Sequence, residues 1–538
     1  MKQLKKWTAL LLALMLMITL VPWSAKAEFA EPTTGTITVK GVEKDATVKA
    51  YRLTKAVFDA NGNFLKYENL VTGTYKEDPQ KPTFKDPQKP TDDEWKALIK
   101  KPVEEFDAAN TTTLSADGAD YKASGLKAGL YMILVTSSKG MVYNPMIVGL
   151  SYAKDDKGHH VNGGEIQVDQ NFNLPDQAKL YAKKSEVPLS KTTEDPSPED
   201  QSNPDSIKGN GLGLNEKPSF KITTTIPSYP TTDKELKFTI TDTLDPGLTP
   251  PAQADVHVTV GGSPIDAANV TVTVQDQKIT IDFKDAYLKS LNGASKDVVV
   301  TYEATLNGNA SVNFAANKNT VVVEYTNDPK NGGTSKHEDI TYHYTFDIDG
   351  LLKGKGSEQT HEITKHGDKI TSTSKWDEDP LEGAFFGLYT EDPSQNPAAQ
   401  PVQTVKTDAT GRMNFTKLDE GKYYIKETQA PNGYSLDTTV HTAEISTVFN
   451  TDGTLASYSI KIDGTSTTTF TATYDKGTVT KVVTGPDNPV LIKNTTIPGL
   501  PTTGGMGTYL FTGIGVALLA GAAVMVTVLR KKNGQTTR

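Results

Sequence analysis

Acids and carboxamides in this chain occupy positions that should face the interior of β-strands. Successive side chains of a strand point to opposite faces, so Asp242 shares a face with Phe238 and Ile240. By the same alternation, Asn319 shares a face with Val321. Burial lowers the pKa of a lysine amine and raises that of a carboxyl group. A lysine buried beside such an acid would therefore be a neutral nucleophile next to a neutral proton donor.

The same arrangement recurs near the C-terminal end. Glu427 shares a strand face with Tyr423 and Ile425. Asn494 shares a face with Ile492 in a later apolar run. Both polar residues are therefore expected to point into a core.

Lysines at the inward spacing supply the candidate amines. Lys191 lies two residues beyond an apolar residue, where a first strand should begin. Lys365 follows an apolar residue with the same spacing and precedes the apolar segment 380–389, which favours it. Lys353 has the same spacing and is the alternative to Lys365.

These residues need a β scaffold, and the sequence predicts one. Thr, Val, Tyr and Ile recur in short alternating runs separated by Gly, Asn, Asp and Pro, for example at 35–40, 237–242 and 298–302. Short alternating strands with frequent turn residues are typical of all-β sandwiches. Only residues 92–106 have a helical pattern, with Trp95 and Leu98 on one face.

Breaks in composition divide the chain into segments. We expect a signal peptide at 1–27, three β-sandwich domains at 28–183, 184–330 and 331–496, and a terminal segment at 497–538. Asn319 is expected in the last strand of the second sandwich. The three sandwiches should account for nearly all of the mature chain.

The two ends of the chain carry export signals. A basic and then apolar leader ends in an A-x-A site, so cleavage is expected after Ala27. Residues 509–529 are uncharged and long enough to cross a bilayer as a helix. Basic residues at 530–532 then predict a cytoplasmic tail.

Between the last sandwich and that apolar span lies a short motif. Its five residues fit LPxTG, the sorting signal of Gram-positive surface proteins: Leu500, Pro501, Thr502, Thr503 and Gly504. The chain thus resembles a substrate that sortase cuts after Thr503 and joins through it to an amine.

Further motifs make the resemblance specific. Residues 423–434 match the E-box of sortase-assembled pilins, YxxxETxAPxGY, and 242–248 resemble the DTLPxGL turn of pilin middle domains. Residues 380–389 resemble the second strand of a CnaB-type domain. Over essentially its whole length the chain resembles Gram-positive backbone pilins of the SpaA and FimA type. This implies tandem immunoglobulin-like sandwiches of the CnaA and CnaB types.

In that family a buried lysine attacks an asparagine carboxamide with the help of an acid, and ammonia leaves. The resemblance implies the bonds Lys191–Asn319, promoted by Asp242, and Lys365–Asn494, promoted by Glu427. These bonds enclose 319 − 191 = 128 and 494 − 365 = 129 positions. Each is expected to tie a first strand to a last one.

The resemblance also implies one exposed lysine that accepts Thr503 of the next subunit. The segment 180–184 lies where the family has a YPKN-like motif, and Lys183 aligns with its lysine. Ala182 stands in place of the proline and Lys184 in place of the asparagine. Lys184 or Lys179 are therefore alternative acceptors.

The implied function is the major subunit of a covalent cell-surface pilus that supports adhesion. Its implied partners are a class C-type pilin sortase, the housekeeping sortase, further copies of the chain, accessory pilins, peptidoglycan and host ligands. A monomeric wall-anchored adhesin and a tip or base pilin are the alternatives. The chain would be a sortase substrate that forms its internal bonds once, not an enzyme.

Composition excludes several other functions. The 538 residues include no cysteine, which removes disulfides and thiol chemistry. A net charge of -9 and a pI near 5.5 argue against nucleic-acid binding. Adjacent His159 and His160 lie in a polar stretch without strand-spaced carboxylates, so neither a metal site nor a cofactor is expected.

Overall fold

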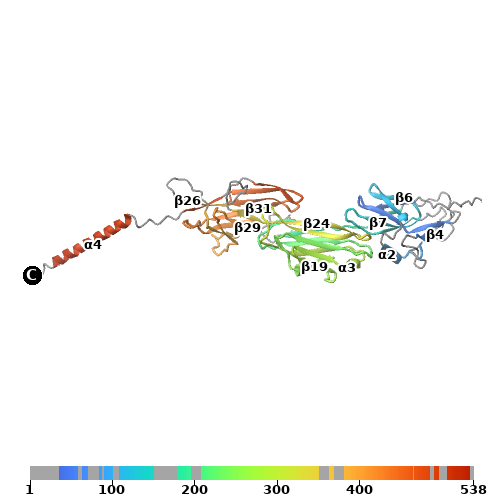
Figure 1. Ribbon diagram of the computed structural model, residues 1–538, viewed down its shortest axis with the longest axis horizontal. Coiled ribbons are helices and arrows are strands. Elements are labelled where there is room, and N and C mark those ends of the chain that lie inside the picture. Colours follow the sequence, from blue (N-terminus) through green and yellow to red (C-terminus); the bar gives the residue numbers. More distant parts are fainter. Residues whose placement is uncertain are drawn as a thin grey trace, which may run out of the picture.

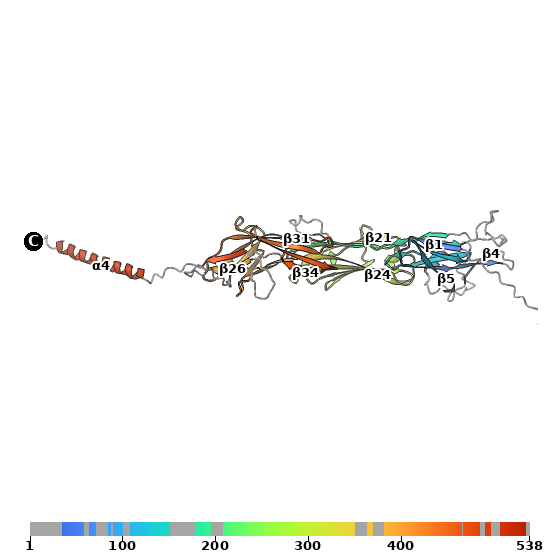
Figure 2. The ribbon, with the colours of Figure 1, turned by 90° about the horizontal axis from the view of Figure 1, so that it is seen from above.

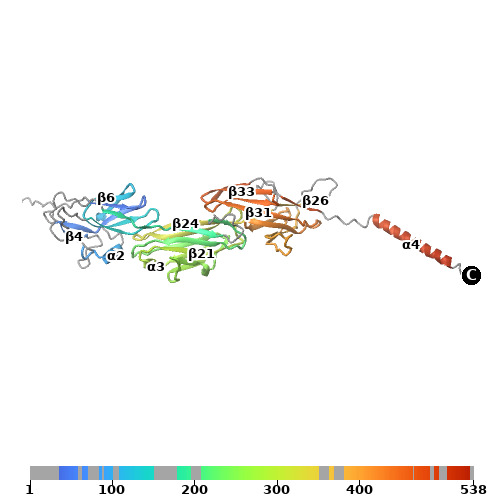
Figure 3. The same cartoon turned by 180° about the vertical axis from the view of Figure 1, so that it is seen from behind.

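The chain forms three β domains arranged in a row (Figures 1 and 2). The computed structural model describes residues 35–58, 64–70, 84–87, 90–100, 108–150, 178–194, 208–349, 363–368, 381–464, 466–484, 490–495 and 506–533. The first domain lies at one end, the middle domain follows, and the third domain lies on the side of the C-terminal helix; Figure 3 shows the same order from behind. The predicted all-β class is confirmed.

The first domain is built on a seven-stranded sheet in the order β10-β1-β6-β5-β2-β7-β9. Its strands are β1 (Gly35–Lys40), β2 (Thr47–Arg52), β5 (Thr111–Asp117), β6 (Asp120–Leu126), β7 (Gly129–Thr136), β9 (Met146–Leu150) and β10 (Ala178–Tyr181). A hairpin of β3 (Thr54–Phe58) and β4 (Phe64–Asn69) lies beside it. Alternating apolar residues such as Val48, Ile133 and Tyr131 form its core.

The predicted helix is present as α2 (Asp92–Lys100), while residues 101–107 lie outside the described part. Leu98 is buried, and Trp95 and Ile99 pack around it with Phe84 and Met132. The face expected from the 3.6-residue period is therefore the one that packs on the domain.

The middle domain is a sandwich of a five-stranded and a six-stranded sheet. The five-stranded sheet has the order β12-β14-β21-β17-β18: β12 (Leu189–Glu194), β14 (Ser219–Ile226), β21 (Lys296–Glu303), β17 (His257–Val260) and β18 (Ser263–Pro264). The six-stranded sheet has the order β13-β24-β23-β15-β20-β19: β13 (Gly209–Gly211), β24 (Gly333–Tyr344), β23 (Asn317–Asp328), β15 (Phe238–Leu244), β20 (Lys278–Phe283) and β19 (Val270–Gln275). A short ladder joins β16 (Leu248–Thr249) to β22 (Thr305–Leu306), and α3 spans Asp285–Ser290.

Strands β23 and β24 form a long antiparallel hairpin that corrects two expectations. The predicted boundary at residue 330 falls in the turn of this hairpin, and β24 extends the six-stranded sheet to Tyr344. Asn319 lies at the start of β23, so it is not in the last strand of the middle domain. Tyr342 and Tyr344, at the end of β24, pack in the core of the third domain. The middle and third domains therefore share one continuous strand.

The third domain contains a seven-stranded sheet in the order β28-β27-β30-β31-β32-β33-β34. These strands are β28 (Gln403–Lys406), β27 (Phe385–Tyr389), β30 (Gly421–Gln429), β31 (Val440–Phe449), β32 (Leu455–Ile462), β33 (Ser466–Asp475) and β34 (Thr478–Thr484). Two ladders complete it: β25 (Phe346–Asp349) with β29 (Asn414–Leu418), and β26 (Ile363–Asp368) with β35 (Val490–Thr495).

The first and middle domains meet through a small set of contacts. β8 (Val142–Tyr143) of the first domain pairs with β11 (Lys184–Ser185). The Tyr325 hydroxyl donates to the Gly140 carbonyl at 2.8 Å. Gly140 has φ +84°, and a Cβ there would lie 2.6 Å from the same hydroxyl, so this close approach requires glycine.

The helix predicted at 509–529 is present within α4 (Met506–Asn533). Within the described part of the chain, no helix is both long and apolar enough to cross a membrane.

Candidate functional site

The middle domain buries a lysine, an acid and a carboxamide between its two sheets. Lys191 comes from β12 of the five-stranded sheet, whereas Asp242 on β15 and Asn319 on β23 come from the six-stranded sheet. All three residues have 0% of their surface exposed. The alternation of β15 and β23 explains this placement, because every second residue of β15, and of β23 as far as Tyr325, is buried.

The hydroxyl of Tyr302, on β21, lies between the three side chains. It donates a hydrogen bond to Asp242 Oδ2, and Lys191 Nζ donates to Asp242 Oδ1. Lys191 Nζ also donates to the Tyr302 hydroxyl at 3.2 Å, and Asn319 Nδ2 donates to it at 2.6 Å. Asp242 thus contacts the lysine directly and is linked to the carboxamide through Tyr302.

Aromatic rings line the lysine. Lys191 Nζ lies 5.2 Å from the centre of the Phe220 ring and 5.7 Å from that of Tyr302. Desolvation lowers the pKa of Lys191 to about 8, against the opposing effect of Asp242. Burial likewise raises the pKa of Tyr302 well above its usual value, so its hydroxyl stays protonated. The amine is therefore far easier to deprotonate than a surface lysine.

A buried histidine, His343, packs against the Phe220 ring beside this group. His343 Nδ1 lies 2.6 Å from Asn210 Oδ1, and its Nε2 lies 3.0 Å from Thr341 Oγ1. The amide oxygen can only accept, so Nδ1 carries the hydrogen and Nε2 accepts from the threonine. Desolvation, with a smaller effect from Lys191, lowers the pKa of His343 to about 3. The ring is neutral and adds no charge beside the amine.

Sequence reasoning missed Tyr302 and His343. Tyr302 shares a strand face with Val298 and Val300, both fully buried, so the alternation of β21 carried a usable signal. His343 lies near the end of β24, where residues 341–344 are all buried and alternation gives no direction.

In the third domain, Glu427 is 2% exposed and shares the buried face of β30 with Tyr423 and Ile425. Its Oε2 accepts a hydrogen bond from the Asp437 backbone at 2.7 Å, which connects it to the loop that follows the strand. This is the inward placement that the strand pattern predicts.

Strands β26 and β35 run side by side and parallel. Lys365 is in register with Ile492, and Gly367 with Asn494. Lys365 and Asn494 therefore lie on adjacent strands, two positions apart. The alternative lysine, Lys353, lies outside the described residues.

Lys183 lies between β10 and β11, at the junction of the first two domains, and is exposed. Its carbonyl accepts from the Asn144 backbone at 3.0 Å, and Ala182 donates to Lys40 at 2.8 Å. The backbone around the lysine is thus fixed while its side chain faces solvent. Lys179 and Lys184 are exposed as well, and Lys184 pairs with Tyr143.

Other predicted positions lie outside the described residues: Ala27, His159, His160 and the motif Leu500, Pro501, Thr502, Thr503 and Gly504.

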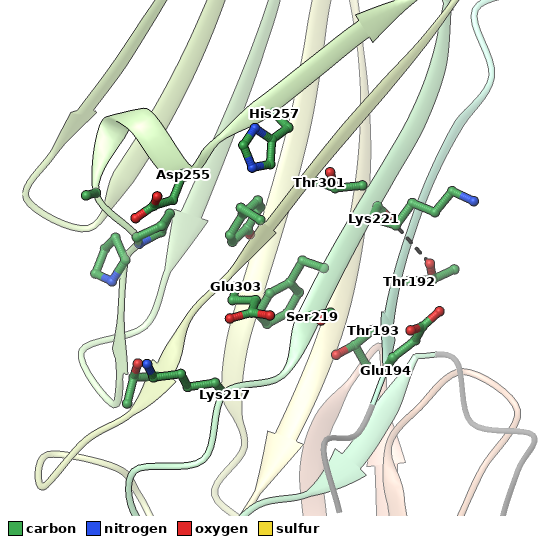
Figure 4. A pocket seen from close by; sticks show the side chains of 16 residues that line it. Thr192, Thr193, Glu194, Lys217, Ser219, Lys221, Asp255, His257, Thr301 and Glu303 are labelled. Carbon is green, nitrogen blue, oxygen red and sulfur yellow. Dashed lines mark hydrogen bonds between the residues drawn. The ribbon is translucent and has the colours of Figure 1, made fainter. Parts of the chain in front are cut away.

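A polar hollow lies on the middle domain beside the buried group (Figure 4). It is lined by threonines and by charged residues of both signs, among them Lys221, Glu303 and His257. Phe220 and Tyr302 line the hollow as well as the lysine site. Within the described ranges, no group of three or more His, Asp or Glu could hold a metal ion.

Three family models match separate segments of the chain. Residues 32–183 match the T6 antigen Ig-like domain, residues 368–461 the SpaA prealbumin-like fold domain, and residues 492–535 the LPXTG cell wall anchor motif. The second match includes β30 and Glu427, and the third includes residues 492–495 of β35 and the sorting motif.

Two relatives are similar over most of the chain. The trypsin-resistant surface T6 protein of Streptococcus pyogenes serotype M6 is 26% identical, over 77% of this chain and 80% of the relative. The fimbrial subunit type 2 of Actinomyces naeslundii is 24% identical, over 67% of this chain and 63% of the relative.

A solved structure has the same fold. The T6 backbone pilin of Streptococcus pyogenes serotype M6, which has a modular three-domain structure, superposes with a TM-score of 0.58. It is 19% identical, and the match covers 87% of this chain and 100% of that one.

Proposed function

We propose a route of assembly for this chain, which is a sortase-assembled backbone pilin anchored to a Gram-positive cell wall. Sortase cleaves between Thr503 and Gly504 and transfers the Thr503 acyl group to Lys183 of another subunit. A new amide bond forms, and the segment that begins at Gly504 leaves. Because donor and acceptor sites differ, the contact is heterologous and gives an open filament.

The exposure of Lys183 at a domain junction supports its role as acceptor. The amine is free to enter the active site of a sortase, while the backbone on both sides is held by hydrogen bonds. The housekeeping sortase then anchors the finished polymer to peptidoglycan. Accessory pilins are added to the same polymer, which supports adhesion.

Within each subunit, Lys191 forms an amide bond with Asn319, promoted by Asp242. Lys365 forms the corresponding bond with Asn494, promoted by Glu427. The buried group of Lys191, Asp242 and Asn319, which the Tyr302 hydroxyl joins by hydrogen bonds, is the observation that carries this proposal. Each bond forms once, releases ammonia and involves no turnover, so the chain is a substrate and not an enzyme.

Cell-wall extracts test the polymer. Blotting for the wild-type chain should give a ladder of high-mass species, and Lys183→Ala should reduce it to the monomer. Lys179→Ala and Lys184→Ala are matched controls that should leave the ladder intact. A ladder that survives Lys183→Ala but disappears in one control would move the acceptor to that lysine. A single wild-type band would refute polymerisation.

Intact mass tests the internal bonds. Each bond removes one ammonia, about 17 Da, so two bonds give a deficit of about 34 Da. Peptide mapping should recover the Lys191–Asn319 pair and a second pair that contains Asn494. Whether that second pair contains Lys365 or Lys353 decides between the two lysines. A full-mass protein would refute both bonds.

A further inference from the structure

The hydroxyl of Tyr302 contacts every group that the middle-domain bond involves. A tyrosine hydroxyl has one hydrogen to donate and two lone pairs that accept. The hydrogen goes to Asp242, and the two lone pairs receive Lys191 Nζ at 3.2 Å and Asn319 Nδ2 at 2.6 Å. Nδ2 is the nitrogen that must leave when Lys191 displaces ammonia.

We propose that Tyr302 is a catalytic residue of this cross-link, which relays the proton of Asp242 to the leaving nitrogen of Asn319. The inference rests on the Lys191–Asn319 bond proposed above and adds a residue to its chemistry.

The relay supplies the proton that the leaving nitrogen needs. An amide nitrogen leaves as ammonia only after it has been protonated. The oxygens of Asp242 contact Lys191 and Tyr302, so its proton reaches Nδ2 through the tyrosine. Tyr302 is 3% exposed and the other three residues are fully buried, so bulk water is a poor proton source at this position.

The steps balance. With the amine neutral and Asp242 protonated, the Nζ lone pair attacks Cγ of Asn319, and the carbonyl electrons move to Oδ1. The protonated Asp242 donates to the Tyr302 oxygen, so the phenol hydrogen turns to the lone pair that Nδ2 gains on attack. Tyr302 gives this hydrogen to Nδ2 and takes one from Asp242. The Cγ–Nδ2 bond breaks, ammonia leaves, and the carbonyl reforms. Nζ returns one proton to Asp242, so acid and tyrosine end unchanged.

The fold holds the hydroxyl in place. Tyr302 pairs across β14 and β21 with Phe220, whose ring stacks on it at 5.1 Å between centroids. Because the stacked Phe220 ring fixes the plane of the Tyr302 ring, the Tyr302 hydroxyl remains between the two sheets. Oδ1 of Asn319 is buried and has no hydrogen-bond partner in the described part of the chain, so Nδ2 is the atom that anchors the carboxamide.

The test is Tyr302→Phe in the full chain, followed by intact mass and peptide mapping over time after synthesis. Loss of a general acid typically slows a reaction by about 100-fold or more. We therefore expect a young sample with a deficit of about 17 Da, from the third domain alone. The control is Tyr229→Phe, which removes another buried hydroxyl of the same domain, one that donates to the Lys237 carbonyl at 3.2 Å. It should keep the full deficit.

The outcomes separate the two proposals. A wild-type chain without a Lys191–Asn319 peptide refutes the bond itself. If the Lys191–Asn319 bond forms in the wild type, and forms as fast in Tyr302→Phe as in Tyr229→Phe, the bond is upheld and the relay is overturned.

A second measurement covers the case in which Tyr302→Phe fails to fold. Lys191→Met removes the nucleophile and leaves Tyr302, Asp242 and Asn319 unreacted. A crystal structure of this variant should show the Tyr302 hydroxyl within hydrogen-bond distance of Nδ2. A hydroxyl turned away from Asn319 overturns the relay.

Discussion

Lys191 and Asn319 belong to opposite sheets of the middle sandwich, and one tyrosine hydroxyl lies within 3.2 Å of the amine and 2.6 Å of the amide. A bond between them would join the two sheets through the core. This geometry makes the consequences of the bond measurable in stability as well as in mass.

Asn319→Ala should destabilise the middle domain, because it removes the cross-link and leaves the contact of Lys191 with Asp242. A bond that closes a loop of 319 − 191 = 128 positions restricts the unfolded chain by about 4–5 kcal/mol. Denaturant unfolding should show a loss of this size, together with the return of about 17 Da of mass.

The matched control for this change is Asn317→Ala on the same buried face of β23. It removes a carboxamide bonded to Ser311 and His343 but no cross-link. Its cost should be that of lost hydrogen bonds, about 1–3 kcal/mol, with an unchanged mass deficit. Equal stability of wild type and Asn319→Ala would contradict the bond.

The unreacted lysine should make stability depend on alkaline pH. In Asn319→Ala the folded pKa of Lys191 is about 8, below its value of 10.5 in the unfolded chain. Between these values the unfolded chain binds the proton that the folded chain has released, so the free energy of unfolding rises with pH. The rise should be about 1.4 kcal/mol per unit between pH 8 and 9.5. The double variant Asn319→Ala with Lys191→Met should lack this rise. If the free energy of unfolding changes with pH equally in the single and double variants, the pKa of Lys191 is not lowered in the folded chain.

His343 should make the domain sensitive to acid. Its folded pKa is about 3, against 6.5 when exposed, so the unfolded chain gains a proton first as pH falls below 6.5. Stability from the neutral ring is complete above that value and declines by about 1.4 kcal/mol per unit towards pH 3. Denaturant unfolding between pH 6 and 4 should show a shallower decline for His343→Gln. The exposed His257, changed to Gln, is the control and should retain the wild-type slope.

Glu427→Gln should prevent the third-domain bond while the middle-domain bond still forms. The amide keeps the shape of the side chain but is a far poorer proton donor. Mapping should recover Asn494 in an unlinked peptide and a total deficit of about 17 Da. Glu444→Gln, on the exposed face of β31, is the control. A linked Asn494 in Glu427→Gln would assign the proton transfer to a different group.

Alternation along single strands was enough to predict several buried polar residues. Asp242, Asn319 and Glu427 each sit two residues from an apolar neighbour, and each is buried. Alternation along β21 indicates that Tyr302 points inward, but its place beside Lys191 and Asn319 depends on how β21 pairs with β14 and faces the opposite sheet. The domain limit at 330 failed for a related reason: Asn-Asp-Pro marks a turn, and a turn inside a hairpin resembles a turn between domains.

The hairpin β23–β24 determines how a fibre of such subunits would respond to a pull. Its turn lies on the side of the first domain, where Asp328 contacts Thr136, and its open end leads into the third domain. Force transmitted through the proposed Lys191–Asn319 bond would pull β23 towards the first domain, while the third domain pulls β24 in the opposite direction. The ladder would then be sheared along its whole length, with its hydrogen bonds sharing the stress.

Asn319 faces Thr341 across that ladder, and the chain runs 341 − 319 = 22 positions from one to the other. If the ladder failed, this chain would extend by roughly 70 Å. A covalent shaft could thus absorb a sudden jerk by lengthening, and it could recover its original length once the two strands paired again.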